Sequence, residues 1–460
     1  MSALWLVCCV ALGAIVVRSA WKRGPRYALG CAMAWSVLVP VWVEWRIGAL
    51  PIDVRIVTCI IGLSAYCLHP SVRLRSRLVG ADWALIALGV VHLVSDAKNS
   101  GFRFSDVLRI YGEWAVPYLT GRLAVQSFPD ARALVPVMSG VCVALAVWAA
   151  TESIAGVNPA NAVFGARPRD LTPMIDTRLG LKRAEGPTRN AIYLGMLFVM
   201  LLPWTVYGAT LALSGAARVW LLAAPIVALV GLFCTVSRSA FLACIVSLYL
   251  TALLRWRRAR WSLLAAAALV VAGVMWQREA VIDALHRWAG DDQGKLVTID
   301  GKKVAYSGTV HRLMLPSLYR NAMAKAGWLG FGTDLTSTFP LKIGVGDKSS
   351  APSSILKFVD NAFILLQLRF GYLGVACFCL FLASTAWYMG RAATRFAGPD
   401  GLFCGLLCGV IVGVAVALLT VWLPQDFGFW LICTAGIATG LEVFFRDAEA
   451  ATAQGALVRA

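Results

Sequence analysis

Long apolar runs recur along almost the whole chain, and they constrain its fold more than any other feature. A helix that crosses a bilayer needs roughly 20 mostly apolar residues, and such runs alternate with polar or basic segments throughout the 460 residues. Only 14% of the residues are charged, whereas a soluble domain carries about a quarter charged residues. The sequence therefore predicts an integral membrane protein with many crossings, and it argues against a soluble enzyme carrying one anchor.

The runs predict an all-α polytopic membrane protein with roughly 12–14 transmembrane helices. The predicted spans lie near 3–17, 27–45, 54–69, 80–96, 108–126, 133–152, 188–208, 218–236, 239–254, 261–276, 358–388, 402–422 and 426–445. The predicted organisation is a transmembrane bundle over 1–276, with a smaller loop at 154–189, then a loop over 277–357, spans over 358–446 and a tail over 447–460. The first span is expected to stay uncleaved, because its basic residues follow the apolar run, the reverse of a signal peptide.

The positive-inside rule orients these spans. Four basic clusters in short loops agree on one side, which we take as cytoplasmic: Lys22/Arg23/Arg26, Arg73/Arg75/Arg77, Arg255/Arg257/Arg258/Arg260 and Arg391/Arg395. The chain then begins outside the cytoplasm, and the tail after Arg446 is cytoplasmic. The loops 154–189 and 277–357 face the periplasm, which makes the expected location a bacterial inner membrane.

Both predicted periplasmic loops are basic. The longer holds eleven Lys and Arg against seven acids, and the shorter six against three. An outward-facing basic surface at a membrane attracts anions such as lipid phosphates and diphosphates; the alternative is that these residues contact membrane lipid headgroups and nothing more. The overall charge of +18 mostly reflects topology, so nucleic acid is not an expected partner.

The thirteen cysteines do not predict a disulfide scaffold or a metal site. Most of them lie inside apolar runs, where cysteine behaves as a small hydrophobic residue, and their spacing does not fit metal ligands. We therefore predict no metal and no cofactor.

Two segments near the middle spans contain candidate site residues: one precedes a predicted span, and the other joins two predicted spans. Arg183 and Arg189 lie in the sequence Lys182–Asn190, which leads directly into a predicted span. Arg238 lies in the tight connection Ser237-Arg238-Ser239-Ala240 between two spans. A charge at such a turn usually has a specific partner, although an arginine that snorkels to the interface would look the same.

Two further segments lie in the long loop and at its end. His311 and Arg312 precede Arg320 by about two helical turns, and Gly330-Phe331-Gly332 follows. Asp360 and Asn361 open the span 358–388. Asp360 is a candidate general base, or else a helix N-terminal carboxylate that interacts with the helix dipole. The other histidines, His69, His92 and His286, are predicted to be structural or exposed.

These motifs, in this order, resemble the O-antigen ligase family, which also includes O-antigen and exopolysaccharide polymerases. The resemblance covers most of residues 110–445. Ser237-Arg238-Ser239-Ala240 resembles the family's Ser-Arg turn, and His311-Arg312 followed by Gly330-Phe331-Gly332 resembles its arginine-bearing loop. Asn361, Gly371 and Gly374 fit the spacing of the ligase motif, but Asp360 stands where that motif has histidine.

The resemblance implies a C-type glycosyltransferase-like fold and a reaction at the periplasmic membrane face. A ligase would transfer a glycan from undecaprenyl diphosphate to a hydroxyl of the lipid A–core. A polymerase would transfer it to another lipid-linked chain. The implied catalytic residues are Asp360, Arg238 and Arg312, and the implied substrate-binding residues are Arg183, Arg189, His311, Arg320 and Asn361.

Arginine forks bind diphosphate and stabilise a leaving group's charge, and a carboxylate accepts a proton from an attacking hydroxyl. The residue types therefore suit glycan transfer. A transporter is a less favoured alternative. It would predict ionisable residues in mid-span, or two related halves with broken helices, and the sequence has few such charges and no evident repeat.

Overall fold

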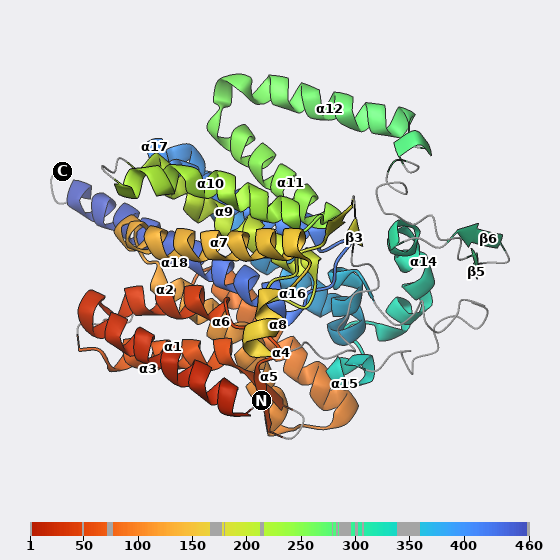
Figure 1. The fold of residues 1–460 in the computed structure, drawn as a ribbon, viewed down its shortest axis with the longest axis horizontal. Helices are drawn as coiled ribbons and strands as arrows, with labels where there is room; N and C mark the ends of the chain where they lie inside the picture. Colours follow the sequence, from red (N-terminus) through yellow and green to blue (C-terminus); the bar gives the residue numbers. More distant parts are fainter. Residues whose placement is uncertain are drawn as a thin grey trace.

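The computed structural model describes residues 2–47, 50–70, 77–165, 177–178, 180–211, 216–277, 279–281, 284, 296–299, 302–305, 308–337 and 359–457. These residues form a helical bundle in which the long helices run roughly side by side (Figure 1). Strands occur there only as three antiparallel two-stranded hairpins. The predicted helical class is therefore confirmed, with small hairpins that the sequence analysis did not predict.

Among the described residues, seven α-helices and one π-helical segment precede the smaller predicted loop, and one short helix lies within it. Their bounds are α1 Ser2–Arg23, α2 Pro25–Ser36, α3 Val54–Leu68, α4 Gly80–Ser100, α5 Phe104–Ile110, a π-helical segment Tyr111–Ala115 that continues into α6 Val116–Ala124, α7 Phe128–Ala155 and α8 Pro159–Phe164. Two hairpins accompany them: β1 Glu44–Ile47 with β2 Leu50–Asp53, and β3 Thr177–Arg178 with β4 Leu181–Lys182.

The second half begins at the end of the smaller loop. Its helices are α9 Ala191–Thr210, α10 Ala216–Cys234, α11 Arg238–Arg255, a 3₁₀ turn Arg257–Ala259, α12 Arg260–Trp276, α14 Gly308–Ala326, α15 Gly332–Ser337, α16 Ala362–Arg395, α17 Gly398–Ala417 and α18 Gln425–Leu457. A third hairpin pairs β5 Leu296–Ile299 with β6 Lys302–Ala305.

Nine of the described helices are long and apolar enough to cross a membrane, and α3 and the apolar part of α10 are shorter candidates. Together they coincide with eleven of the thirteen predicted spans, which supports a polytopic membrane protein. The predicted span 27–45 is not one helix: α2 ends at Ser36, and β1 begins at Glu44. The predicted span 108–126 is helical without a break from Phe104 to Ala124, with a π-helical segment in its middle.

Small residues allow the central helices to approach closely. A Cβ on Gly409 or Gly413 of α17 would overlap a backbone carbonyl of α11, and a Cβ on Gly436 of α18 would overlap the Tyr118 carbonyl of α6. Apolar side chains gain little from burial when the alternative is lipid, so close backbone packing is the usual source of helix association in membranes. The most deeply buried of the long described helices are α9, α17 and α18, which form the bundle centre.

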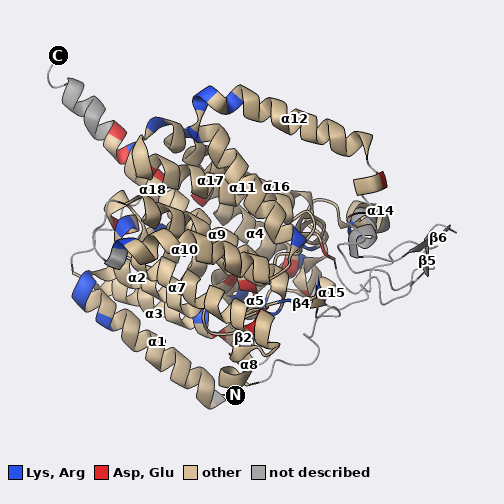
Figure 2. Cartoon of the chain, turned by 45° about the horizontal axis from the view of Figure 1, so that its top comes forward, with Lys and Arg blue, Asp and Glu red and all other residues tan. Residues whose placement is uncertain are grey.

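The described helices of the predicted loop 277–357, α14 and α15, lie at one side of the molecule (Figure 1). Helix α12 lies along the outside of the bundle, and α14 and α15 lie at the end that it leads to (Figure 1). Much of the predicted loop, and residues 166–176 of the smaller loop, lie outside the described residues. Lys and Arg residues colour the ribbon blue at the α1–α2 junction and at the connection into α12, both away from α14 (Figure 2).

Candidate functional site

The turn between α17 and α18, Leu418–Pro424, connects the segments that carry the predicted site residues. Asn361 Nδ2, at the start of α16, donates to the Leu419 carbonyl at 2.8 Å. Ser239, at the start of α11, lies within hydrogen-bond distance of Thr420, with 3.1 Å between hydroxyl oxygens. The Trp422 indole donates to the Tyr193 hydroxyl on α9. One turn therefore joins the starts of α9, α11 and α16 at the same end of the bundle.

Arg312 and Asp360 form an ion pair at this end. Arg312 Nη2 lies 3.5 Å from Asp360 Oδ2. Arg312 is on α14, which packs on the start of α16 through Leu315, Tyr319 and Ala322. The Asp360 side chain is 32% exposed, so its carboxylate is accessible to a substrate. The structure thus brings together two of the three predicted catalytic residues.

Asn361 has a clear structural task beside this pair. Its Oδ1 accepts from Ile364 N at 3.0 Å, which caps the N-terminus of α16, and the first turn of a helix otherwise leaves such N–H groups unpaired. The Ala362 N–H lies close to the carbonyls of Leu418 and Val421. Asn361 therefore holds the adjacent Asp360 at a fixed point on the turn.

Arg238 is the first residue of α11 and follows a strained turn. Val236 has φ of 43°, a left-handed conformation that is a genuine outlier for a β-branched residue. Strain of this kind costs about 1–3 kcal/mol and clusters at functional sites. Arg178 Nη1 donates to the Val236 carbonyl at 3.2 Å. The β3–β4 hairpin thus places a second arginine against the turn that carries Arg238.

Arg183 follows the same hairpin and is 8% exposed. The next residue, Ala184, donates its N–H to the Cys234 carbonyl at 3.0 Å, at the end of α10. The Glu152 carboxylate accepts the N–H groups of Glu185 and Gly186 at 3.0 and 2.8 Å. These bonds fasten the segment that contains Arg183 to the turn before Arg238.

Arg189 is bound to Asp426 at the start of α18. Its Nε and Nη2 lie 2.8 and 2.7 Å from Asp426 Oδ2, and its backbone N–H donates to Oδ1 at 3.1 Å. Burial by itself lowers the pKa of Arg189, but the Asp426 carboxylate more than reverses this, so the pKa is raised. Tyr193 lies within electrostatic range of both Asp426 and Asp360, so both ion pairs lie at this end of the bundle.

The remaining two predicted residues lie on α14. His311 directly precedes Arg312, and Arg320 is exposed two turns further on. Arg320 is displaced from Arg312 by roughly 80° around the axis at about 100° per residue, so the two do not share one line along the helix. Pro316 lies inside the helix without ending it.

Two glycine motifs hold α14 against α16. Gly371 has φ of 67° and interrupts α16, and this break lets Tyr372 N and Leu373 N donate to the carbonyls of Gly327 and Trp328. Phe331 N donates to the Leu368 carbonyl at 2.8 Å. A Cβ on Gly371 would overlap the Trp328 carbonyl, and a Cβ on Gly330 would overlap the Arg369 carbonyl. The Gly330-Phe331-Gly332 motif is therefore the place where the backbone after α14 packs directly on the backbone of α16.

Gly371→Ala is expected to destabilise the protein by more than about 3 kcal/mol, because it combines a left-handed backbone with overlap against backbone atoms that cannot move aside. Thermal unfolding of the protein in lipid nanodiscs would measure this. Gly273→Ala on α12 is the matched control, since nothing lies within 4 Å of its added Cβ. Equal melting temperatures for the two variants would contradict the docking role.

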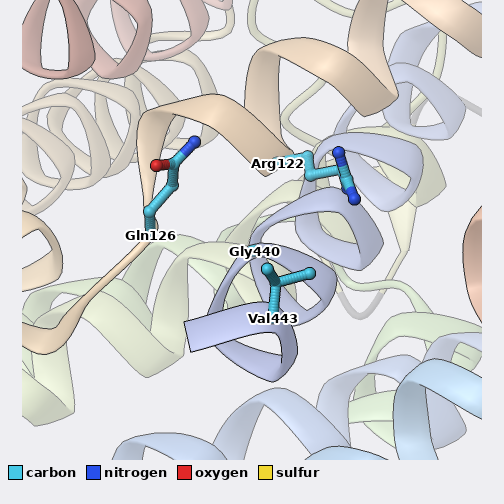
Figure 3. A pocket seen from close by; sticks show the side chains of 4 residues that line it. All are labelled: Arg122, Gln126, Gly440 and Val443. Atoms are coloured by element: carbon cyan, nitrogen blue, oxygen red, sulfur yellow. The ribbon is translucent and has the colours of Figure 1, made fainter. Parts of the chain in front are cut away.

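A small pocket elsewhere in the fold is separate from this site. It is lined by Arg122, Gln126, Gly440 and Val443, from α6, the segment after it and α18 (Figure 3). Arg122 is bound to Asp82 at the start of α4, whereas the end of α4 contacts the docked Gly-x-Gly loop. The 21 residues of α4 separate the two ends by roughly 30 Å at 1.5 Å per residue.

Cations predominate on the segments that form the site. The cations on the β3–β4 hairpin and the segment after it, at the start of α11 and on α14 include Arg178, Lys182, Arg183, Arg189, Arg238 and Arg312. The acids beside them are Glu185, Asp360 at the start of α16, Glu152 of α7 and Asp426 of α18. Within the described residues no group of three or more Asp, Glu, His or Cys has the arrangement of a metal site. The arrangement suits an anionic group held by arginines beside one accessible carboxylate.

The sequence matches no family profile and no curated protein.

Proposed function

We propose that the protein is a membrane glycosyltransferase that moves a glycan from undecaprenyl diphosphate to an acceptor hydroxyl at the periplasmic face of the inner membrane. We propose an O-antigen ligase, for which the acceptor is a sugar of the lipid A–core. The observation that carries the proposal is the Arg312–Asp360 pair, 3.5 Å apart, at the bundle end where Arg238 and Arg183 also lie.

Each residue has a task in this reaction. Arg312 and Arg238 bind the diphosphate, since guanidinium forks match phosphate oxygens. Asp360 takes the proton from the acceptor hydroxyl as its oxygen attacks the anomeric carbon. The bond from that carbon to the diphosphate breaks, and the arginines stabilise the charge that develops on the leaving undecaprenyl diphosphate. A single in-line displacement of this kind inverts the anomeric configuration.

The position of the site relative to the basic clusters supports this orientation. Two of the clusters that the positive-inside rule assigns to the cytoplasm, at the α1–α2 junction and at the connection into α12, lie away from α14 (Figure 2). In this proposal the site faces the periplasm, where lipid-linked glycans and the lipid A–core would meet. The fold would then be that of the C-type glycosyltransferases, with α14 and α15 as a periplasmic lid.

A polymerase is the second candidate, because Asp360 replaces the histidine that the ligase motif carries. In that case the acceptor is the end of another glycan on undecaprenyl diphosphate, and the donor chemistry is the same.

Deletion of the gene is expected to leave bare core on a lipopolysaccharide gel, while long polymer accumulates on undecaprenyl diphosphate. Core with a single repeat, and no long lipid-linked polymer, would instead establish the polymerase. An unchanged ladder together with unchanged lipid-linked glycans would contradict both assignments. Complementation with the wild-type gene is the control.

A further inference from the structure

A buried polar cluster joins α4 to the loop that follows α14. We call it the clasp, and it consists of His92, Asp96, Trp114 and Thr333. His92 and Asp96 are 0% and 1% exposed, and more than 230 residues of sequence separate them from Thr333. Burying a carboxylate is costly unless it is paired and hydrogen-bonded, so a cluster of this kind calls for a specific role.

The hydrogen bonds of the clasp determine the tautomer of His92. The Trp114 indole N–H, which can only donate, donates to His92 Nδ1 at 3.2 Å. The proton of the neutral imidazole therefore lies on Nε2. That nitrogen faces Asp96 Oδ2 at 3.2 Å and Thr333 Oγ1 at 3.1 Å. The histidine thus bridges α4 to the first turn of α15.

Asp96 binds the same turn through its other oxygen. Oδ1 accepts the Thr333 N–H at 2.6 Å, and a Cβ on Gly332 would lie 3.0 Å from that oxygen. Around the carboxylate lie Arg109 of α5, at 3.7 Å, and His92. The buried Arg369 of α16 is also within electrostatic range of Asp96 and of Glu113. The charge of Asp96 is therefore balanced by two arginines, from α5 and α16, while the neutral His92 faces its Oδ2.

The same face of α4 also binds α16 and the loop that follows α14. Ser95 Oγ donates to the Arg369 carbonyl at 2.7 Å, and Asn99 Nδ2 donates to the Gly330 carbonyl at 3.3 Å. Gly330 N in turn donates to the Ala326 carbonyl at the end of α14. The clasp and these neighbouring bonds together fix the C-terminal end of α14 relative to both α4 and α16.

Arg312 lies near the other end of α14, fourteen residues before Ala326, or about 20 Å along the axis at 1.5 Å per residue. A small tilt at the clasp is amplified over this length. A displacement of about 1 Å at a reacting group can cost roughly 100-fold in rate, so the anchoring of α14 bears directly on how Arg312 meets its substrate.

We propose that Asp96 and His92 are positioning residues that set the placement of α14, and thereby hold Arg312 beside Asp360 for binding of the lipid diphosphate. This inference rests on the proposed function for the role of Arg312. The anchoring of α14 itself does not depend on that function.

Hydrogen exchange on the full-length protein in nanodiscs tests the anchoring. Asp96→Ala is expected to accelerate exchange at the Phe331, Tyr372 and Leu373 amides, which cross between the α14–α15 loop and α16, while exchange in α9 and α17 stays unchanged. Thr333→Val, which keeps the side-chain shape but loses the hydroxyl, should give the same change more weakly. Unchanged exchange at these amides in both variants would overturn the inference.

The matched control is Asp82→Ala at the opposite end of α4. Asp82 is 4% exposed and binds Arg122 and Tyr118, so its loss also removes a buried, paired carboxylate. It should lower thermal stability without changing exchange at the three amides. Acceleration by Asp82→Ala as large as that by Asp96→Ala would mean general destabilisation and would overturn the positioning role.

Binding of undecaprenyl diphosphate tests the functional part. Asp96→Ala should weaken binding about tenfold in the otherwise wild-type protein, and should have no further effect when Arg312→Gln is present, because it acts through that arginine. An equal loss in both backgrounds would overturn the positioning role. If Arg312→Gln alone leaves binding unchanged, the proposed donor site fails, while the exchange data still decide whether the clasp anchors α14.

Discussion

Asp360→Asn is expected to lower the rate of glycan transfer by roughly 10²–10⁴-fold, the range that general-base catalysis contributes. Asparagine has nearly the same shape, so the cap on α16 made by Asn361 should persist. The amide cannot accept the proton of the attacking hydroxyl, and the loss should therefore appear in kcat rather than in donor binding. Transfer by the purified protein in nanodiscs, with a lipid-linked glycan and an acceptor, would measure it.

Asp447→Asn is a matched control for this variant. Asp447 is 37% exposed and lies 3.7 Å from Arg77, which closely resembles the exposure and spacing of Asp360 and Arg312. It lies near the end of α18, outside the proposed site, and its loss should leave transfer unchanged. Near-normal transfer by Asp360→Asn would exclude a base at this position.

The apolar runs predicted most of the helices because a run of about 20 apolar residues has few alternatives to a membrane helix. The prediction of one helix was wrong for the run 27–45. The run 27–45 is mostly apolar, but its helix ends at Ser36, before Pro40, whose ring cannot continue a helix interior. The run 108–126 is helical as predicted, and its π-helical segment is a local detail that hydropathy cannot reveal.

The sequence motifs identified candidate site residues, but not the residues from other elements that bind them. Asp360 and Arg312 were found from residue type and spacing, and the structure places them in one ion pair. Asp426 was not predicted, because an acid at the start of a helix is common and nothing local indicates that Arg189 will reach it. His92 looked like one of several structural or exposed histidines, and only the fold brings Thr333 to it.

The glycine motifs could be recognised in the sequence, but the physical reason why glycine is needed at these positions could not. Gly330 and Gly371 belong to segments 41 residues apart, and their role is the close approach of two backbones. A Gly-x-Gly alone is too common to imply a function. The need for glycine at both positions follows from the contact between them, which depends on how α14 packs on α16.

Arg312→Gln is expected to weaken binding of undecaprenyl diphosphate by roughly 10–150-fold, since a hydrogen bond to a charged group contributes about 1.5–3 kcal/mol. Transfer should fall at least as much, because the same guanidinium stabilises the leaving group. Arg312→Lys should recover only part of the binding, since an ammonium keeps the charge but loses the planar fork. Equilibrium binding in nanodiscs at two salt concentrations would measure these losses.

Lys325→Gln separates specific binding from general attraction to a basic surface. Lys325 is an exposed cation in the last turn of the same helix, so this variant removes one positive charge from α14 without touching the Arg312–Asp360 pair. If long-range attraction alone holds the donor, both glutamine variants should weaken binding equally, and raising the salt should abolish the effect. A larger loss for Arg312→Gln that persists at high salt would mean direct contact, because a partly buried guanidinium is screened less than an exposed ammonium.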